Sequence, residues 1–229
     1  TFILLILGGK DLGTALIFAG IAFCLLFLAG LNGGFFITSI SLIGMSFVAL
    51  IFTAPNRLRR FKAFLDPFAP SVYKFAGWQP AHSIMGLASG GLFGVGIGAS
   101  KQKWANLAEA HTDFIFSVLG EEMGLFGTLL LLALYGVMLW ATFRVAIRAR
   151  DTFQKFTVAG IACWLTLQIF TNIATNVGLA PVIGVTLPFM SYGGSSMIAN
   201  LMAMGFVLKV AQEQGGIRRI SKAERRISS

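Results

Sequence analysis

The side chains that could do chemistry in this chain are acidic residues within positions 109–122. Glu109 and Asp113 stand four positions apart with His111 between them, and two adjacent glutamates close the segment. On a helix, residues four apart share a face, so Glu109 and Asp113 would lie side by side. Asp113 also precedes an apolar run, and an acid near a membrane costs free energy unless it is solvated or paired. We therefore expect Asp113 to be a functional acid.

A structural explanation for the same acids stays open. Asp113, Glu121 and Glu122 each lie near an expected helix start. A carboxylate there can accept hydrogen bonds from free backbone N–H groups and interact favourably with the helix dipole. This capping role fits the two glutamates better than Asp113, because other polar residues crowd the turn that holds Asp113.

Two kinds of chemistry would suit acids at a membrane surface. In glycosyl transfer, Asp113 would accept the proton of an attacking sugar hydroxyl, while Lys101 and Lys103 would neutralise a departing pyrophosphate. In transport, the acids would form a proton relay or a counter-ion for the substrate. The lysine pair could equally belong to a solvated loop, and the residues alone do not decide between these chemistries.

The elements that would position these residues are membrane-spanning helices. The chain is 56% hydrophobic and only 12% charged, whereas a soluble domain is about 25% charged. Apolar runs long enough to cross a bilayer recur along it. We predict an all-α integral membrane protein, a polytopic bundle over residues 1–210. It would comprise the tail of one helix and spans near 12–30, 35–54, 82–99, 119–143, 156–177 and 193–210. Glycines crowd the 82–99 segment, which could instead be broken or re-entrant.

The charge distribution predicts which side of the membrane each loop occupies, because cytoplasmic loops collect Lys and Arg. With these six spans, all but two of the 18 basic residues fall on one side, the exceptions being Lys101 and Lys103. We therefore expect residues 57–74, 144–155 and the C-terminus to be cytoplasmic, and loops 100–118 and 178–192 to be outside. Residues 211–229 are expected to form a disordered, basic cytoplasmic tail that touches anionic lipid.

Other functions fit this composition poorly. A net charge of +9 would suggest nucleic-acid binding in a soluble chain, but here the basic residues flank apolar spans and indicate topology. Cys24 and Cys163 both lie in apolar runs, and two histidines without a Cys-x-x-Cys pair offer little for zinc. We expect no nucleic-acid partner and no cofactor, while the need for a divalent metal stays open.

Five motifs resemble those of a known membrane family. They are KDLGTA, FLDPFA, SGGLFGVGIG, AEAHTDFIFSVLGEEMG and TLPFMSYGGSSMIANLMAMG. From their order and spacing, the chain is identified as a member of the SEDS family, the shape, elongation, division and sporulation proteins. It most resembles the septal member, with the elongation member as the alternative. The resemblance implies a ten-helix bundle, of which this chain would supply the C-terminal part with about six helices. We do not expect this part alone to be active.

The resemblance also implies an activity and its residues. Family members polymerise lipid II into peptidoglycan glycan strands and release undecaprenyl pyrophosphate at the outer face of the bacterial cytoplasmic membrane. They work with a class B penicillin-binding protein and the divisome. The family's essential acid falls on Asp113. The residues expected to bind substrate are Glu109, His111, Lys101, Lys103, Glu122, Ser191, Tyr192, Gly193, Gly194, Ser195 and Ser196. The last six could instead cap a helix and pack closely.

Three hypotheses follow. The protein is a glycosyltransferase with Asp113 as its base, a lipid II flippase, or a non-catalytic scaffold that recruits the cross-linking enzyme. Replacing Asp113 by Asn would separate them, because only the first requires this carboxylate to accept a proton during polymerisation.

Overall fold

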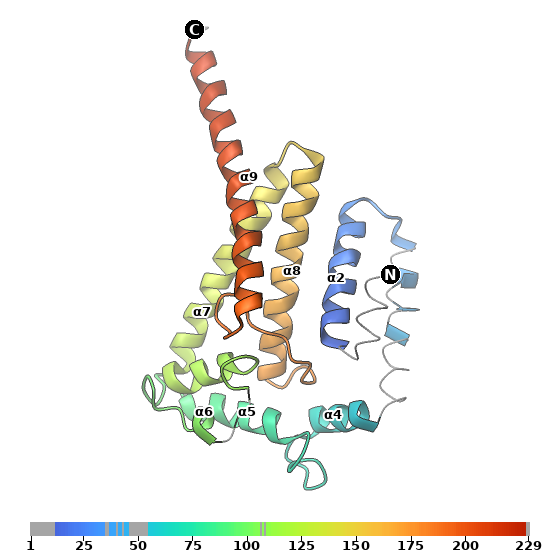
Figure 1. The fold of residues 1–229 in the computed structure, drawn as a ribbon, viewed down its shortest axis with the longest axis vertical. Coiled ribbons are helices and arrows are strands. Elements are labelled where there is room, and N and C mark those ends of the chain that lie inside the picture. The colour runs from blue at the N-terminus through green and yellow to red at the C-terminus, as the bar shows by residue number, and fades with distance from the viewer. Residues whose placement is uncertain are drawn as a thin grey trace.

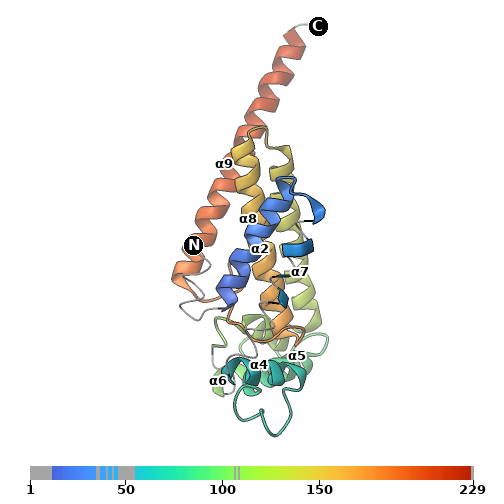
Figure 2. The same ribbon diagram turned by 90° about the vertical axis from the view of Figure 1, so that its right-hand side faces the viewer.

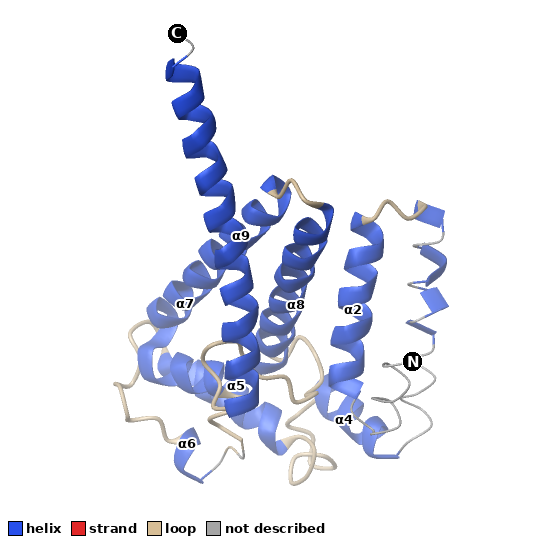
Figure 3. Ribbon diagram, turned by 45° about the horizontal axis from the view of Figure 1, so that its top comes forward, coloured by secondary structure: helices blue, strands red, loops and turns tan. Residues whose placement is uncertain are grey.

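The fold is entirely helical in the residues that the structure describes. The computed structural model describes residues 12–34, 37–39, 41, 42, 44, 45, 55–105, 107 and 109–227. Its helices are α2 (Leu12–Leu28), α4 (Pro55–Leu65), α5 (Trp78–Gly90), α6 (Gln102–Ala105), α7 (Ile115–Arg148), α8 (Thr152–Asn176) and α9 (Gly194–Ile227). Figure 3 shows helices and loops throughout this part of the chain and no strand, so the predicted all-α class is confirmed.

Four of the helices run alongside one another as a bundle. Figure 1 shows α2 beside α8, with α7 and α9 on the other side of α8, and in Figure 2 the four helices again run roughly along one axis. Helices α2 and α8 are antiparallel, because Gly20 faces Leu167 and Gly160 faces Leu25. In the described part of the chain, Ile115–Arg148, Thr152–Asn176 and Gly194–Gly215 are long and apolar enough to cross a membrane.

The bundle has two different ends. One end, which we call the site end, carries α4, α5, α6 and the loops 107–114 and 177–193 (Figure 1). Contacts confirm this grouping: Arg60 Nη1 on α4 donates to the carbonyl oxygen of Val182 at 3.5 Å, and Ser83 Oγ on α5 donates to that of Asn176 at 2.9 Å. The other end, the C-terminal end, carries the turn 149–151 and the last turns of α9.

The predicted span over residues 82–99 is corrected, because α5 covers Trp78–Gly90 and the following residues form turns. These turns lie against a break in α7, where Gly124 has a φ of 65°. The N–H of Val95 donates to the Glu121 carbonyl oxygen at 2.9 Å. A Cβ on Gly94 would overlap the Glu122 carbonyl group. The glycines therefore permit two interrupted backbones to complete each other's hydrogen bonds, as a broken segment requires.

This correction changes the predicted topology. Because residues 82–99 do not cross the bundle, α4 lies at the site end together with loop 107–114, and not with residues 144–155 (Figure 1). The prediction that all basic residues except Lys101 and Lys103 share one side is therefore wrong. Helix α4 and the segment after it bring Arg57, Arg59, Arg60, Lys62 and Lys74 to the site end.

The ends of the chain show a second difference. Helix α9 continues to Ile227, where a disordered tail over 211–229 was expected. Lys, Arg, Ala and Glu are good helix formers, so the charged composition of this segment does not prevent a helix. The predicted span over 35–54 and the expected helix tail in residues 1–11 lie largely or wholly outside the described residues.

Candidate active site

Asp113 lies at the site end, in the turn that leads into α7, and two asparagines hold its backbone. The Nδ2 atoms of Asn172 and Asn176 both donate to the Asp113 carbonyl oxygen, at 2.8 and 2.9 Å. These asparagines occupy positions i and i+4 in the last turns of α8 and are fully buried. Buried amides of this kind are retained where they are hydrogen-bonded, so the position of Asp113 is fixed by α8.

The same asparagines join four segments of the site end. Asn172 Nδ2 also donates to the Val185 carbonyl oxygen at 2.6 Å. Asn176 Oδ1 accepts from the N–H of Ser117 on α7 and from Ser83 Oγ on α5, both at 3.3 Å. The sequence analysis did not identify this pair, although two asparagines four positions apart in an apolar helix were a usable signal, since polar residues at membrane depth are uncommon.

Glu109 shapes the turn that presents Asp113. Its φ is 60°, and its carbonyl oxygen accepts the N–H groups of Thr112 and Asp113, both at 3.1 Å. Thr112 Oγ1 donates to Glu109 Oε2 at 2.9 Å. Residues 109–113 thus form a single hydrogen-bonded turn within the predicted loop 100–118, and Glu109 and Asp113 are neighbours in it.

This environment raises the pKa of Asp113 above its usual value. Burial of the carboxyl group is the largest cause and the negative charge of Glu109 is the second, while a hydrogen bond from Thr112 acts in the opposite direction. Desolvation and a nearby like charge both disfavour the ionised form. A carboxyl with a raised pKa is a better proton acceptor than an ordinary aspartate, because the best catalytic pKa lies near the working pH.

The final motif meets the acidic turn directly. The N–H of Tyr192 donates to the His111 carbonyl oxygen at 2.8 Å, and Ser191 Oγ donates to that of Thr112 at 2.5 Å. Gly184, in the preceding loop, is close enough that a Cβ there would lie 3.4 Å from Asp113 Oδ2. The two motifs, which the sequence predicted to lie on the same side, are therefore in contact.

The remaining predicted residues of this motif lie at the start of α9. Gly193 precedes the helix, which begins at Gly194 and includes Ser195. Ser196 Oγ lies 3.2 Å from Thr186 Oγ1. The Tyr192 side chain is 83% exposed and is free to meet a ligand, whereas the buried Ser191 is engaged with the backbone.

The other predicted residues form a second, separate cluster. Lys103 Nζ and Glu122 Oε1 form an ion pair at 2.7 Å. Glu121 is buried and accepts hydrogen bonds from Ser100 Oγ at 2.5 Å and from the N–H of Lys101 at 3.1 Å. Its role is structural, because it caps the residues that lead into α6. It lies inside α7 and not at the start of that helix, where the capping explanation placed it. The Lys101 side chain is exposed.

A cation that the sequence assigned to the opposite side lies near this site. Arg60 lines a cavity of about 240 Å³ together with Val182 and Gly178. Val182 packs against the cluster of Leu107, Ala110, Phe114 and Val118, which supports the acidic turn. The corrected topology is what adds Arg60 to the candidate site. Among the described residues, no group of three His, Cys, Asp or Glu side chains is arranged to hold a metal ion.

A family model places this site in context. The model described as "Cell cycle protein", for FtsW, RodA and SpoVE, matches residues 1–215. The chain belongs to this family. Stage V sporulation protein E of Bacillus subtilis is 41% identical over 210 residues, covering 91% of this chain and 57% of that protein. A Geobacter protein named probable peptidoglycan glycosyltransferase FtsW is 42% identical over 221 residues, covering 94% of this chain and 58% of that protein. The chain thus spans little more than half the length of these FtsW/RodA/SpoVE relatives.

Solved structures share the fold. One comes from work on a peptidoglycan synthase complex that coordinates polymerization and crosslinking, with a TM-score of 0.75 and 29% identity over 93% of this chain and 59% of that one. Another is a mutant of the rod shape determining protein RodA from Thermus thermophilus, with a TM-score of 0.59 and 29% identity over 93% of this chain and 54% of that one.

Proposed function

We propose that this protein is a peptidoglycan glycosyltransferase that polymerises lipid II at the outer face of the bacterial cytoplasmic membrane during cell division. The support is membership of the FtsW/RodA/SpoVE family and relatives named for this activity. The single observation that carries the proposal is Asp113, a carboxyl with a raised pKa whose backbone is fixed by two buried asparagines.

Asp113 acts as the general base in this mechanism. One of its carboxylate oxygens accepts the proton of an attacking sugar hydroxyl, while the oxygen of this hydroxyl bonds to the anomeric carbon of the second substrate. The bond from this carbon to the pyrophosphate oxygen breaks at the same time, and undecaprenyl pyrophosphate leaves with the electron pair. Attack opposite the leaving group inverts the anomeric centre. General-base catalysis contributes a factor of about 10²–10⁴ to such a step.

Cations at the site end neutralise the pyrophosphate. Lys103 already pairs with Glu122, so Lys101 and Arg60 are better suited to this role. Lys101 is exposed, and the Arg60 guanidinium lines a cavity beside the loop that borders Asp113. Glu109, His111 and the 191–196 motif then contact the sugars or phosphates around Asp113.

The proposed location follows from this chemistry. The site end faces the exterior, where lipid II is polymerised, and the C-terminal end faces the cytoplasm. The basic residues of α4 lie in a segment of about 60 residues between the membrane helices, at the length beyond which loops are translocated largely regardless of charge. A class B penicillin-binding protein and other divisome proteins are the proposed partners, at the division septum.

The decisive experiment replaces Asp113 by Asn and measures polymerisation of purified lipid II by the reconstituted protein with its partner. The rate should fall by about 10²–10⁴, the range for loss of a general base. The matched control is Asp66→Asn, which alters an exposed aspartate in the segment after α4 and should leave the rate unchanged.

The same preparation separates the alternative functions. If Asp113→Asn polymerises lipid II at the normal rate, the base assignment fails. A flippase would move labelled lipid II between vesicle leaflets without lengthening it. A scaffold would do neither but would still bind the penicillin-binding protein.

A further inference from the structure

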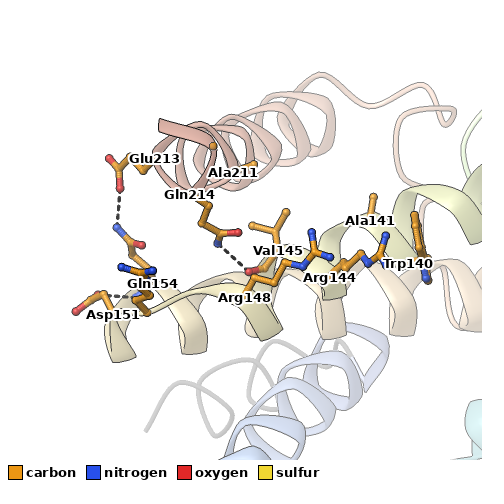
Figure 4. Close-up of a pocket in the computed structure, with 12 residues that line it drawn as sticks. Trp140, Ala141, Arg144, Val145, Arg148, Asp151, Gln154, Ala211, Glu213 and Gln214 are labelled. Carbon is orange, nitrogen blue, oxygen red and sulfur yellow. Dashed lines mark hydrogen bonds between the residues drawn. The ribbon is translucent and has the colours of Figure 1, made fainter. Parts of the chain in front are cut away.

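A large cavity lies at the C-terminal end, away from Asp113. It has a volume of about 620 Å³ and lies between the end of α7, the turn before α8 and residues 211–215 of α9 (Figure 4). Arg144 and Arg148 of α7 and Arg150 of the turn contribute three guanidinium groups to its lining. Neither the proposed catalytic step nor the family motifs account for this cavity.

The three arginines offer positive charge to a ligand. The Arg144 guanidinium lies over the Trp140 ring, 4.5 Å from its centre, and this contact leaves its N–H edges available. All three arginines are exposed. Among the residues whose side chains the structure describes, no carboxylate forms an ion pair with any of them.

The two acids that line the cavity are already engaged. Asp151 caps α8, its Oδ2 accepting the N–H of Gln154 at 2.9 Å. Glu213 on α9 accepts a hydrogen bond from Gln154 Nε2 at 2.8 Å through one carboxylate oxygen, and the other lies 3.9 Å from Lys209 Nζ. Neither acid forms an ion pair with the arginines among the described residues. Three arginines against two carboxylates leave the lining net positive, so the cavity favours an anion.

Specific contacts build the wall that α9 contributes. Gln214 Nε2 donates to the Val145 carbonyl oxygen at 3.0 Å. This carbonyl is one of the last in α7, and the N–H of Ala149 bonds to Ala146 instead, so Gln214 fills a position that the helix end leaves open. Figure 4 shows Gln214 and Glu213 reaching from α9 towards Val145 and Gln154. The cavity therefore depends on α9 remaining helical to residues 213–215, at the end of its apolar part.

The surroundings match the boundary between lipid and water. Trp140, Ile147 and Phe153 are 59%, 76% and 70% exposed, which in a membrane protein directs them to lipid. Tryptophan gathers at the membrane interface, and arginines there attract the phosphates of anionic lipids. A cationic cavity beside apolar, outward-facing side chains is complementary to a molecule with a phosphate head and hydrocarbon tails.

We propose that this cavity binds the phosphate headgroup of an anionic membrane lipid. Arg144, Arg148 and Arg150 contact the phosphate, and the acyl chains lie along the exposed apolar side chains of α7 and α8. Because Gln214 attaches α9 to α7, the lipid stabilises the cytoplasmic extension of α9. The proposal requires membrane insertion with this end at the interface, and it does not depend on the glycosyltransferase activity.

The test reconstitutes the full protein in phosphatidylcholine nanodiscs with increasing phosphatidylglycerol and counts retained lipids by native mass spectrometry. Each arginine near an anionic surface is worth about 1 kcal/mol, which is about fivefold in affinity. Arg148→Gln should therefore weaken phosphatidylglycerol retention about fivefold. Lys155→Gln removes an equal charge at the same end, from a residue that does not line the cavity, and should have little effect.

A second variant distinguishes a cavity from a diffuse basic surface. Gln214→Leu changes no charge but removes the bond to Val145, and it should also weaken phosphatidylglycerol retention. The proposal would be overturned if Arg148→Gln and Lys155→Gln retained phosphatidylglycerol equally. It would also be overturned if Gln214→Leu retained phosphatidylglycerol as well as the unmodified protein does. A third result would also overturn it. In nanodiscs of phosphatidylcholine alone, inorganic pyrophosphate would bind to the unmodified protein but not to Arg148→Gln, and added phosphatidylglycerol would not compete with it. The ligand would then be a soluble phosphate.

Discussion

Replacing Asn172 by Leu tests whether α8 positions the proposed base. Leucine has a similar volume but cannot donate the hydrogen bonds that Asn172 Nδ2 makes to the carbonyl oxygens of Asp113 at 2.8 Å and Val185 at 2.6 Å. The Asp113 carbonyl would keep one bond, from Asn176. The Val185 carbonyl would lose the side-chain donor that holds it. The turn bearing Asp113 would then be held to α8 by one amide instead of two.

The expected magnitudes follow from these contacts. Leaving a buried carbonyl without a partner costs about 1–3 kcal/mol, although hydrogen bonds within membrane proteins average about 0.6 kcal/mol. The total loss of stability should therefore be about 1–3 kcal/mol, which a folded membrane protein can tolerate. A displacement of about 1 Å at a catalytic group can lower the rate about 100-fold, so kcat should fall about 10–100-fold while KM changes little.

The assay is lipid II polymerisation by reconstituted protein, with thermal unfolding measured on the same preparations. Gln168→Leu is the matched control, one turn earlier on α8. Its Nε2 makes one hydrogen bond, to Thr186 Oγ1 at 3.2 Å, and its Oε1 has no partner among the described residues. A kcat for Asn172→Leu within twofold of that of the Gln168→Leu protein would refute the argument that these amides position Asp113.

Three further substitutions test other parts of the site. Glu109→Gln removes a charge that raises the pKa of Asp113. Since the base must be ionised, the acidic limb of the pH–rate profile should move to lower pH. Thr112→Val removes a hydrogen bond that lowers the pKa of Asp113, so it should move the same limb to higher pH. Arg60→Gln should weaken use of the pyrophosphate-linked substrate and lower kcat/KM about tenfold, an effect that Lys62→Gln should not reproduce in the same polymerisation assay. Glu121→Gln weakens charge-assisted bonds from Ser100 Oγ and from the backbone N–H groups of Lys101 and Gln102 and should cost about 2 kcal/mol in thermal unfolding. A melting temperature equal to that of the unmodified protein would contradict the structural role of Glu121.

Much of the site could be predicted from local sequence. Asp113, Glu109 and His111 are neighbours along the chain, so their proximity needs only one turn. The apolar spans that became α7 and α8 follow from length and hydropathy, which are also local properties. The resemblance to known motifs added a residue-level hypothesis for the 191–196 segment, and the contacts of Ser191 and Tyr192 bring that segment to the acidic turn.

The glycine-rich segment shows where prediction from local properties failed. Residues 82–99 are as apolar as a membrane span, and hydropathy does not distinguish a helix from a turn that packs against another broken helix. The difference depends on Gly94 lying against the Glu122 carbonyl group and on the break at Gly124. Glu122 and Gly124 belong to a different segment, so their effect cannot be read from residues 82–99. One wrong span reversed the assigned side of the described residues between α2 and α5, including Arg60.

The sequence by itself determined that this is an α-helical membrane protein with one conspicuous acid, because composition, apolar run length and motif identity are properties of the chain. Only the tertiary structure decided which end each loop occupies, that Asn172 and Asn176 hold Asp113, and that Lys103 is paired while Arg60 is near the site. These features arise from contacts between residues far apart in the chain. Burial by the surrounding elements is the largest cause of the raised pKa of Asp113, and the hydrogen bonds from α8 fix its position. Neither follows from the order of residues alone.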